Sequence, residues 1–162
     1  MRAVVEKIVN ACTNTLFKEF GSSYTYYVDL PDQNFSTPSF TADVINPLQE
    51  RKHPFSLRLV NDGVPTFKKA MLYYRTMPVV LQYFPKDKKG KKECFAVAER
   101  LFDCMEEIEL DGQIIRGTDL EMQITENVLQ FFVTYRFYTQ TLADDEGAFE
   151  SVYTDVTHDT NN

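Results

Sequence analysis

The first part of the chain changes from a helical to an extended pattern of apolar residues. Over residues 3–20 the apolar side chains recur at helical spacing, and Gly21 follows them as a helix C-cap would. Residues 24–30 are rich in aromatic and β-branched side chains and end at a proline, which predicts a first strand. Residues 39–45 alternate between apolar and polar side chains and predict a second, half-exposed strand.

Residues 51–67 are harder to assign. Two short apolar runs flank the turn sequence Asn61-Asp62-Gly63, which favours an extra hairpin. Pro65 interrupts the second run, so a mobile loop is the alternative. After this segment, residues 69–75 and 77–84 are expected to be extended. The second of these ends at Pro85 and is the best candidate for a central strand.

The second part of the chain predicts a helix followed by two hairpins. Residues 92–107 carry one apolar stripe at helical spacing. Asp111-Gly112 suits a tight turn between residues 108–110 and 113–116, and Glu126-Asn127 separates residues 119–125 from 128–138.

These elements predict the α+β class, in the order α-β-β-(β)-β-α-β-β-β-β. Two helices on one face of a mostly antiparallel sheet would bury the apolar side chains most economically. We expect residues 1–142 to form a single domain, with residues 51–67 as a hairpin or loop insertion. Residues 143–162 lose the periodicity and become acidic and polar, so they predict a flexible C-terminal tail.

The charge is unevenly distributed. The chain has a formal net charge of −7, of which −6 lies in residues 143–162, where six acidic residues stand without a lysine or arginine. The remaining residues are therefore nearly neutral. A dedicated duplex-DNA binder would need a basic face to displace counterions, so this class of protein is disfavoured.

The sequence offers little for catalysis. Its only histidines, His53 and His158, stand far apart, and the three cysteines lie on apolar stripes without metal-ligand spacing. We therefore expect no enzyme activity, no metal and no cofactor, and three buried free thiols. No apolar run approaches the roughly 20 residues of a membrane span, and the N-terminus does not read as a signal peptide, so cytosolic synthesis is expected.

Three groups of residues are candidates for contacts with other proteins. Residues 86–92 contain five lysines, which form either a solvated connection or an electrostatic contact with a neighbour's acidic tail or with passing nucleic acid. The segment 51–67 offers the cation Arg51 and apolar side chains expected to be exposed. An excess of aromatic residues over residues 24–74 also favours an interface, although ordinary core packing is equally compatible. The candidate contacts are Lys86, Lys88, Lys89, Lys91, Lys92, Arg51, Phe55, Leu57, Phe67, Asp144, Asp145 and Glu146.

Three strings carry a resemblance to a known family: QYFP at 82–85, AERLFDC at 98–104 and the DG-x-IRG hairpin at 111–117. With their surroundings they resemble phage tail terminator (tail-completion) proteins over residues 3–140. Segment 51–67 looks longer than in that family, and the acidic end at 143–162 looks additional.

The resemblance implies a virion protein at the head-proximal end of the tail. It implies a hexameric ring that caps the tail tube, ends its polymerisation and joins tail to head. The expected partners are further copies of the chain, the tail tube protein, and sheath or head-completion proteins, with DNA only in passage. The alternatives are another neck, tube or baseplate component, or a regulatory binding protein of a prophage.

Overall fold

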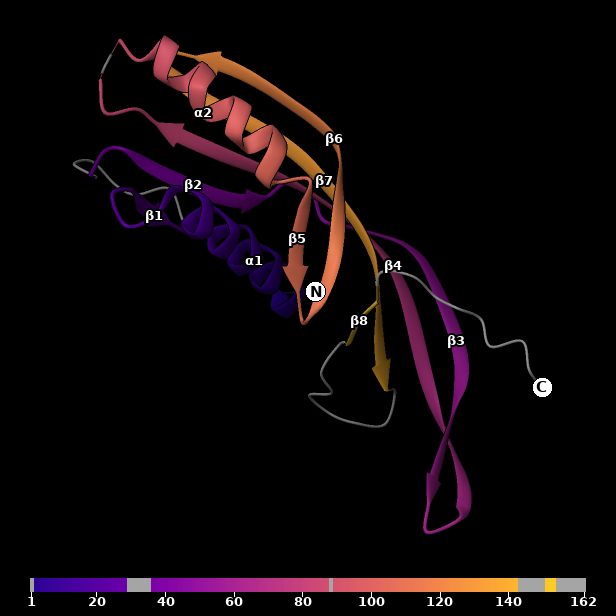
Figure 1. Ribbon diagram of the computed structural model, residues 1–162. Coiled ribbons are helices and arrows are strands. Elements are labelled where there is room, and N and C mark those ends of the chain that lie inside the picture. The colour runs from indigo at the N-terminus through magenta and orange to yellow at the C-terminus, as the bar shows by residue number, and fades with distance from the viewer. Residues whose placement is uncertain (1, 29–35, 88, 143–150, 154–162) are drawn as a thin grey trace.

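The computed structural model describes residues 2–28, 36–87, 89–142 and 151–153 (Figure 1). It contains two helices, α1 (Arg2–Phe20) and α2 (Lys91–Cys104). The first group of strands is β1 (Thr25–Tyr27), β2 (Ser39–Val44), β3 (Leu48–Asn61) and β4 (Val64–Phe84). The second is β5 (Glu107–Leu110), β6 (Gln113–Thr125), β7 (Val128–Leu142) and β8 (Ser151–Tyr153). The chain is thus of the α+β class, as the sequence predicts.

The strands form a sheet in the order β1-β2-β4-β7-β6-β5, with β3 added to β4 and β8 added to β7. All pairs are antiparallel except β1 with β2. The 21-residue strand β4 organises the sheet, because β7 accompanies one of its sides while its other side is shared. On that shared side β2 pairs with the C-terminal part of β4, and β3 pairs with the N-terminal part.

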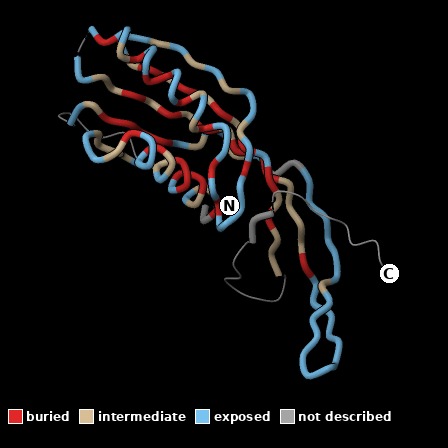
Figure 2. The backbone as a smooth tube through the Cα atoms, in the orientation of Figure 1, coloured by how far each residue is buried: buried red, intermediate tan, exposed pale blue. Residues whose placement is uncertain are grey.

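The core lies between the helices and one face of the sheet. Phe40, Tyr83 and Leu129 are in register across β2, β4 and β7, and all three are buried. Phe20 of α1 contacts Phe40 with ring centroids 4.7 Å apart. In the same way, Phe102 of α2 contacts Phe131 of β7 at 5.1 Å. Both helices therefore pack on the same face, which Figure 2 shows as the main concentration of buried residues.

Three hairpins turn through two residues that both have positive φ. These turns are Asp62-Gly63, Asp111-Gly112 and Glu126-Asn127, with φ between 49° and 77°. A left-handed pair matches the natural twist of the flanking strands, which is why Asp-Gly is a strong turn signal. The hairpins predicted at 108–116 and 119–138 are confirmed, and the uncertain segment 51–67 is a hairpin rather than a loop.

Two predicted strand boundaries are wrong. Residues 69–75 and 77–84 belong to the single strand β4, in which Pro78 is tolerated because the neighbour of β4 changes from β3 to β2 at that point. Residues 113–116 and 119–125 likewise form the single strand β6. A bulge between Thr118 and Glu121, where Asp119 has a φ of 56°, bends this strand without ending it.

The first strand and the segment after residue 142 also differ from the prediction. The first strand, predicted over residues 24–30, is confirmed only as Thr25–Tyr27. Tyr24 and Val28 do not belong to a strand, and residues 29 and 30 lie outside the described residues. Three residues of the segment expected to be flexible form β8, in which Ser151, Val152 and Tyr153 pair with β7. The acidic composition of residues 143–162 concealed this strand. The domain boundary at residue 142 stays a prediction.

Candidate functional site

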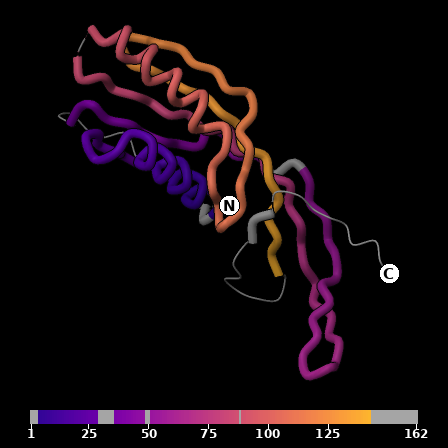
Figure 3. The backbone as a smooth tube through the Cα atoms, viewed as in Figure 1, coloured from indigo at the N-terminus to yellow at the C-terminus, as the bar shows by residue number. Residues whose placement is uncertain are grey.

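The β3–β4 hairpin projects beyond the body of the molecule. We call residues 51–69 the arm. Every arm residue is exposed except Leu57, which is half-buried, and Ala70 is the first buried residue of β4 (Figure 2). In Figure 3 the arm extends past the part of the sheet that the helices cover. Within the described residues β3 pairs only with β4, so its outer edge is open.

Large apolar side chains lie on this exposed arm. Phe67 is 68% exposed, Val60 63% and Val64 60%, while Phe55 and Leu59 also reach solvent. The predicted contacts Phe55, Leu57 and Phe67 are among the arm's apolar residues, and Arg51 stands at its base. Sequence reasoning missed Leu59, Val60 and Val64. Their apolar pattern in the sequence does not distinguish them from residues of a buried strand. Their position beside the Asp62-Gly63 turn was the only signal that they would be exposed.

The arm is also basic. It carries Arg51, Lys52, Arg58, Lys68 and Lys69 against the single acid Asp62, a net charge of +4. Arg51 lies over the ring of Tyr74 at 5.3 Å and Lys52 over that of Tyr73 at 5.9 Å, contacts that fix the base of the arm. Among the described residues, none of the five cations has an ion-pair partner.

The lysine-rich loop lies at the opposite end of β4 from the arm tip. Lys86, Lys89, Lys91 and Lys92 are exposed there, and Lys88 lies outside the described residues. Glu93 organises this loop, because its carboxylate accepts hydrogen bonds from the Lys86 amide at 2.8 Å and from the Tyr83 hydroxyl at 2.7 Å. The hydrogen bond to Glu93 and burial raise the pKa of Tyr83 above its ordinary value of 10.0.

The predicted pairing between this loop and a neighbour's acidic tail stays a prediction. Asp144, Asp145 and Glu146 lie outside the described residues. The loop and the arm were proposed together as contact regions, yet β4 separates them by most of its length (Figure 1). A partner of ordinary size would therefore contact one of them at a time.

An acidic region spans the C-terminal half of α2, β5 and β6. Residues 99–126 contain nine acids against Arg100 and Arg116, a net charge of −7. Three of these acids are paired, in Lys7–Asp111, Arg116–Glu107 and Arg136–Asp119. The other six are exposed and without an ion-pair partner among the described residues. Glu121 lies two residues before Gln123, on the face of β6 away from the helices, and Glu126 lies in the β6–β7 turn. We call the four that follow one another along α2 and β5 the acidic surface: Glu99, Asp103, Glu106 and Glu109.

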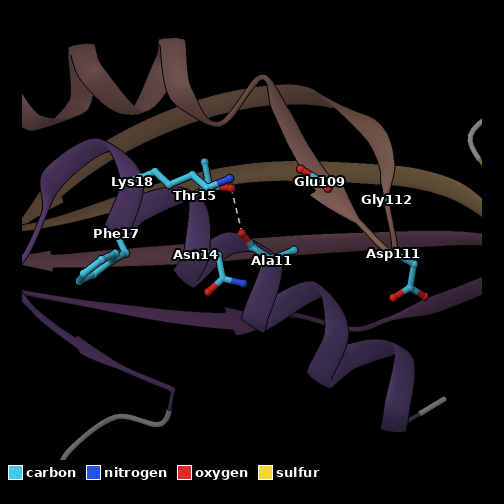
Figure 4. A pocket seen from close by; sticks show the side chains of 8 residues that line it. All are labelled: Ala11, Asn14, Thr15, Phe17, Lys18, Glu109, Asp111 and Gly112. Carbon is cyan, nitrogen blue, oxygen red and sulfur yellow. Dashed lines mark hydrogen bonds between the residues drawn. The ribbon is translucent and has the colours of Figure 1, made fainter.

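A shallow groove of about 340 Å³ adjoins this acidic surface. It lies between α1 and the β5–β6 turn (Figure 4). The ion pair between Lys7 and Asp111, 2.7 Å long, joins α1 to the β5–β6 turn. Phe17 is 52% exposed beside the groove, so an apolar wall faces the acid Glu109. The lining consists of Ala11, Asn14, Thr15, Phe17, Lys18, Glu109, Asp111 and Gly112.

The described residues do not assemble a reactive centre. His53 is exposed on the arm, and His158 lies outside the described residues. Burial raises the pKa of the Cys12 and Cys104 thiols from 9.0 to about 12, so both remain protonated and poor nucleophiles at neutral pH. In the described ranges no group of three metal-ligating side chains converges, and neither helix is long and apolar enough to cross a bilayer.

Three residues of the expected aromatic excess belong to the core. Tyr24, Tyr26 and Phe40 pack with Phe20 and Tyr83 in one aromatic cluster under α1. This cluster fixes α1 and β1 to the sheet, so these rings are not available to a partner. Aromatic side chains that reach solvent include Phe55 and Phe67 of the arm and Phe17 of α1.

The sequence was compared with known protein families. Residues 54–147 match the family described as phage tail terminator protein, which is more than half of the 162 residues. The match includes most of the arm and the whole segment from α2 to β7, whereas the resemblance had been expected over residues 3–140. No curated protein matches the chain. From the match over residues 54–147, the chain belongs to the phage tail terminator family, whose members are structural proteins of the virion tail.

Proposed function

We propose that this protein is the tail terminator of a long-tailed phage. In this proposal six copies form a ring on the last ring of the tail tube, end its polymerisation, and present a surface to head-completion proteins. The family match carries the proposal. The projecting arm supports it, because a monomeric protein rarely exposes so many large apolar side chains without a partner.

A ring requires heterologous contacts, in which one surface of a subunit meets a different surface of the next. The chain offers several such surfaces in different places. The outer edge of β3 is open among the described residues, the arm is basic and apolar, and the acidic surface lies on other elements. Open strand edges and projecting hairpins are common sites of association.

The face of the sheet away from the helices supports the passage of DNA through the proposed ring. Gln82, Gln130 and Gln123 are in register across β4, β7 and β6 on this face. Amide side chains are polar but uncharged, so they would contact DNA without the counterion release that makes binding tight. We therefore propose that DNA passes such a ring without a specific site.

Tail length in a phage that lacks the gene for this protein tests the function. If the protein ends polymerisation, electron micrographs will show detached tails of variable and excessive length, and expression of the wild-type protein will restore one length and head attachment. A tail-tube or baseplate component would instead leave no tails. Normal tails would contradict a structural role and favour a regulatory protein.

Native mass spectrometry of the purified chain addresses the ring itself. The proposal predicts hexamers, formed either by the free protein or on addition of tail tubes. Open polymers of unlimited length would contradict a terminator, because a terminator must stop at one ring.

A further inference from the structure

We propose that the arm of one copy binds the acidic surface and adjoining groove of a second copy, and that this contact holds neighbouring subunits together. The inference rests on the proposed function, since it names the contact that closes the ring. It identifies both sides of the contact by residue, and both lie on this chain.

The side chains of the arm do not reach the acidic surface of their own subunit. Gly63 at the tip is seven residues beyond Ala70, the first buried residue of β4, so the tip extends about 23 Å past the core. In Figure 1 the arm extends away from α2 and β5, the elements that carry most of the acidic surface. Its cations and apolar side chains are therefore presented to another molecule.

The charges of the two surfaces are complementary. The arm carries +4 over residues 51–69, and residues 99–109, which include the acidic surface, carry −4. The cations of the arm and the acids of the acidic surface have no ion-pair partners among the described residues, so their fields are not cancelled within the subunit. Two copies would consequently attract each other in this orientation and repel each other arm to arm.

The apolar side chains favour a protein partner over a nucleic acid. Phe67, Val60 and Val64 are each at least 60% exposed, and a phosphate backbone offers them nothing to pack against. The groove of about 340 Å³ beside the acidic surface has the apolar side chain of Phe17 in its wall, with Glu109 close by. It can accept one apolar side chain of the arm while a neighbouring lysine or arginine meets Glu109.

The contact is heterologous, because the arm and the acidic surface are different parts of the chain. When the arm of the first copy binds the second, the arm of the second remains free for a third. Such a chain of contacts closes into a ring if the rotation per subunit divides a full turn, and otherwise continues as a filament. A mutual exchange of arms within a closed dimer is the other geometry, and measured stoichiometry distinguishes the two.

Charge reversal in the full-length protein tests the proposal. The arm variant R58E/K68E and the surface variant E106K/E109K should each weaken self-association about tenfold or more, as measured by sedimentation velocity at low salt. A chain with all four substitutions should recover association, because the attraction is restored with opposite signs. Rising salt should weaken the wild-type assembly, since the contact is partly electrostatic.

The matched control is K89E/K92E, which changes the net charge as much as R58E/K68E does but at the opposite end of β4. It should associate like the wild type. Equal loss in this control would overturn the proposal, because net charge alone would then explain the effect. Circular dichroism melts of all variants check that each is folded.

Other outcomes also overturn the inference: a wild-type chain that stays monomeric at low salt, failure of the fourfold variant to recover, or loss of duplex-DNA binding as the only effect of R58E/K68E. The tail-length assay is independent of these results. If wild-type protein restores tail length while the arm variants assemble normally, the inference fails and the proposed function stands. If tails are normal without the protein, the proposed function fails whatever the arm does.

Discussion

The strand β4 passes through two environments, and the body and the arm can be compared along its length. From Ala70 to Phe84 every residue is buried or half-buried, and Met77, Val79 and Leu81 face the helices. From Val64 to Lys69 every residue is exposed, although valine and phenylalanine recur there too. Buried apolar side chains therefore stabilise the body. The arm is held only by its hairpin hydrogen bonds and by the contacts at its base.

This difference separates stability from function. A two-stranded hairpin by itself is marginally stable in water, so apolar side chains on the arm add little to the folding of one subunit. In the body, apolar side chains of the same types are buried between the sheet and the helices. Substitutions in the body should therefore act on the free energy of unfolding, and substitutions in the arm on association.

The largest effect is expected for Phe131→Ala. Phe131 is fully buried in β7 and contacts Phe102 of α2, so truncation leaves a cavity between the sheet and the helix. We expect the free energy of unfolding to fall by about 3–5 kcal/mol, as measured by urea denaturation followed by circular dichroism. A loss below about 1 kcal/mol would mean that the helices do not pack on β7 as described.

Gly117→Ala should have the next largest effect. A Cβ atom at this position would lie 2.5 Å from Cγ2 of Val133 and 2.8 Å from the backbone oxygen of Met105. The Met105 carbonyl cannot move without disturbing the connection from α2 to β5, and Val133 is buried in β7, so we expect a loss of about 1–3 kcal/mol in the same assay.

The matched control is Gly63→Ala at the arm tip, where φ is +76° and the space around Cβ is open. This change strains the turn alone. It should leave the urea midpoint of the body unchanged, and an equal loss at both positions would contradict the separation of arm and body.

Tyr135→Phe tests a single buried hydrogen bond. The Tyr135 hydroxyl donates to the Met105 backbone oxygen at 2.8 Å in a fully buried site, and burial raises its pKa above the ordinary value. Removing the hydroxyl leaves that oxygen without this donor, so a loss of about 1–3 kcal/mol is expected. Tyr74→Phe, at a half-buried tyrosine whose hydroxyl makes no hydrogen bond in the described structure, should change stability by less than about 0.5 kcal/mol.

The smallest effect on stability is expected for Phe67→Ala in the arm. Phe67 is 68% exposed, so its truncation should change the free energy of unfolding by less than about 0.5 kcal/mol. Self-association, by contrast, should weaken measurably in sedimentation velocity. A large loss of stability in the monomer would show that the arm packs on its own subunit, and the comparison drawn from β4 would no longer hold.

Much of the fold could be predicted from local patterns. The apolar stripes of α1 and α2 and the turn pairs at Asp111-Gly112 and Glu126-Asn127 carry their own signals, because helix periodicity and left-handed turns depend on neighbouring residues only. The extent of β4 and β6 could not be predicted in this way. Pro78 and Asp119 resemble strand breaks in sequence, and only the neighbouring strands show that β4 and β6 continue through them.

The position of some candidate contacts could be predicted, and their role as contacts stays a prediction. Arg51, Phe55, Leu57 and Phe67 were chosen because they flank a turn in an uncertain segment, and the structure places them all on the arm. The acidic surface was missed, since Glu106 and Glu109 lie close in sequence to residues of an ordinary solvated helix end. Glu109 lines the groove because the β5–β6 hairpin packs against α1.

The sequence by itself determined the class of the fold, both helices, and a resemblance that the family match confirms. Of the three thiols expected to be buried, Cys12 and Cys94 are buried and Cys104 is half-buried. These properties depend on residue types and on spacing along the chain. The tertiary structure decided which apolar residues are core and which are exposed. Burial depends on whether a second layer covers a strand, and the helices cover β4 from Met77 to Tyr83 but end before the arm begins.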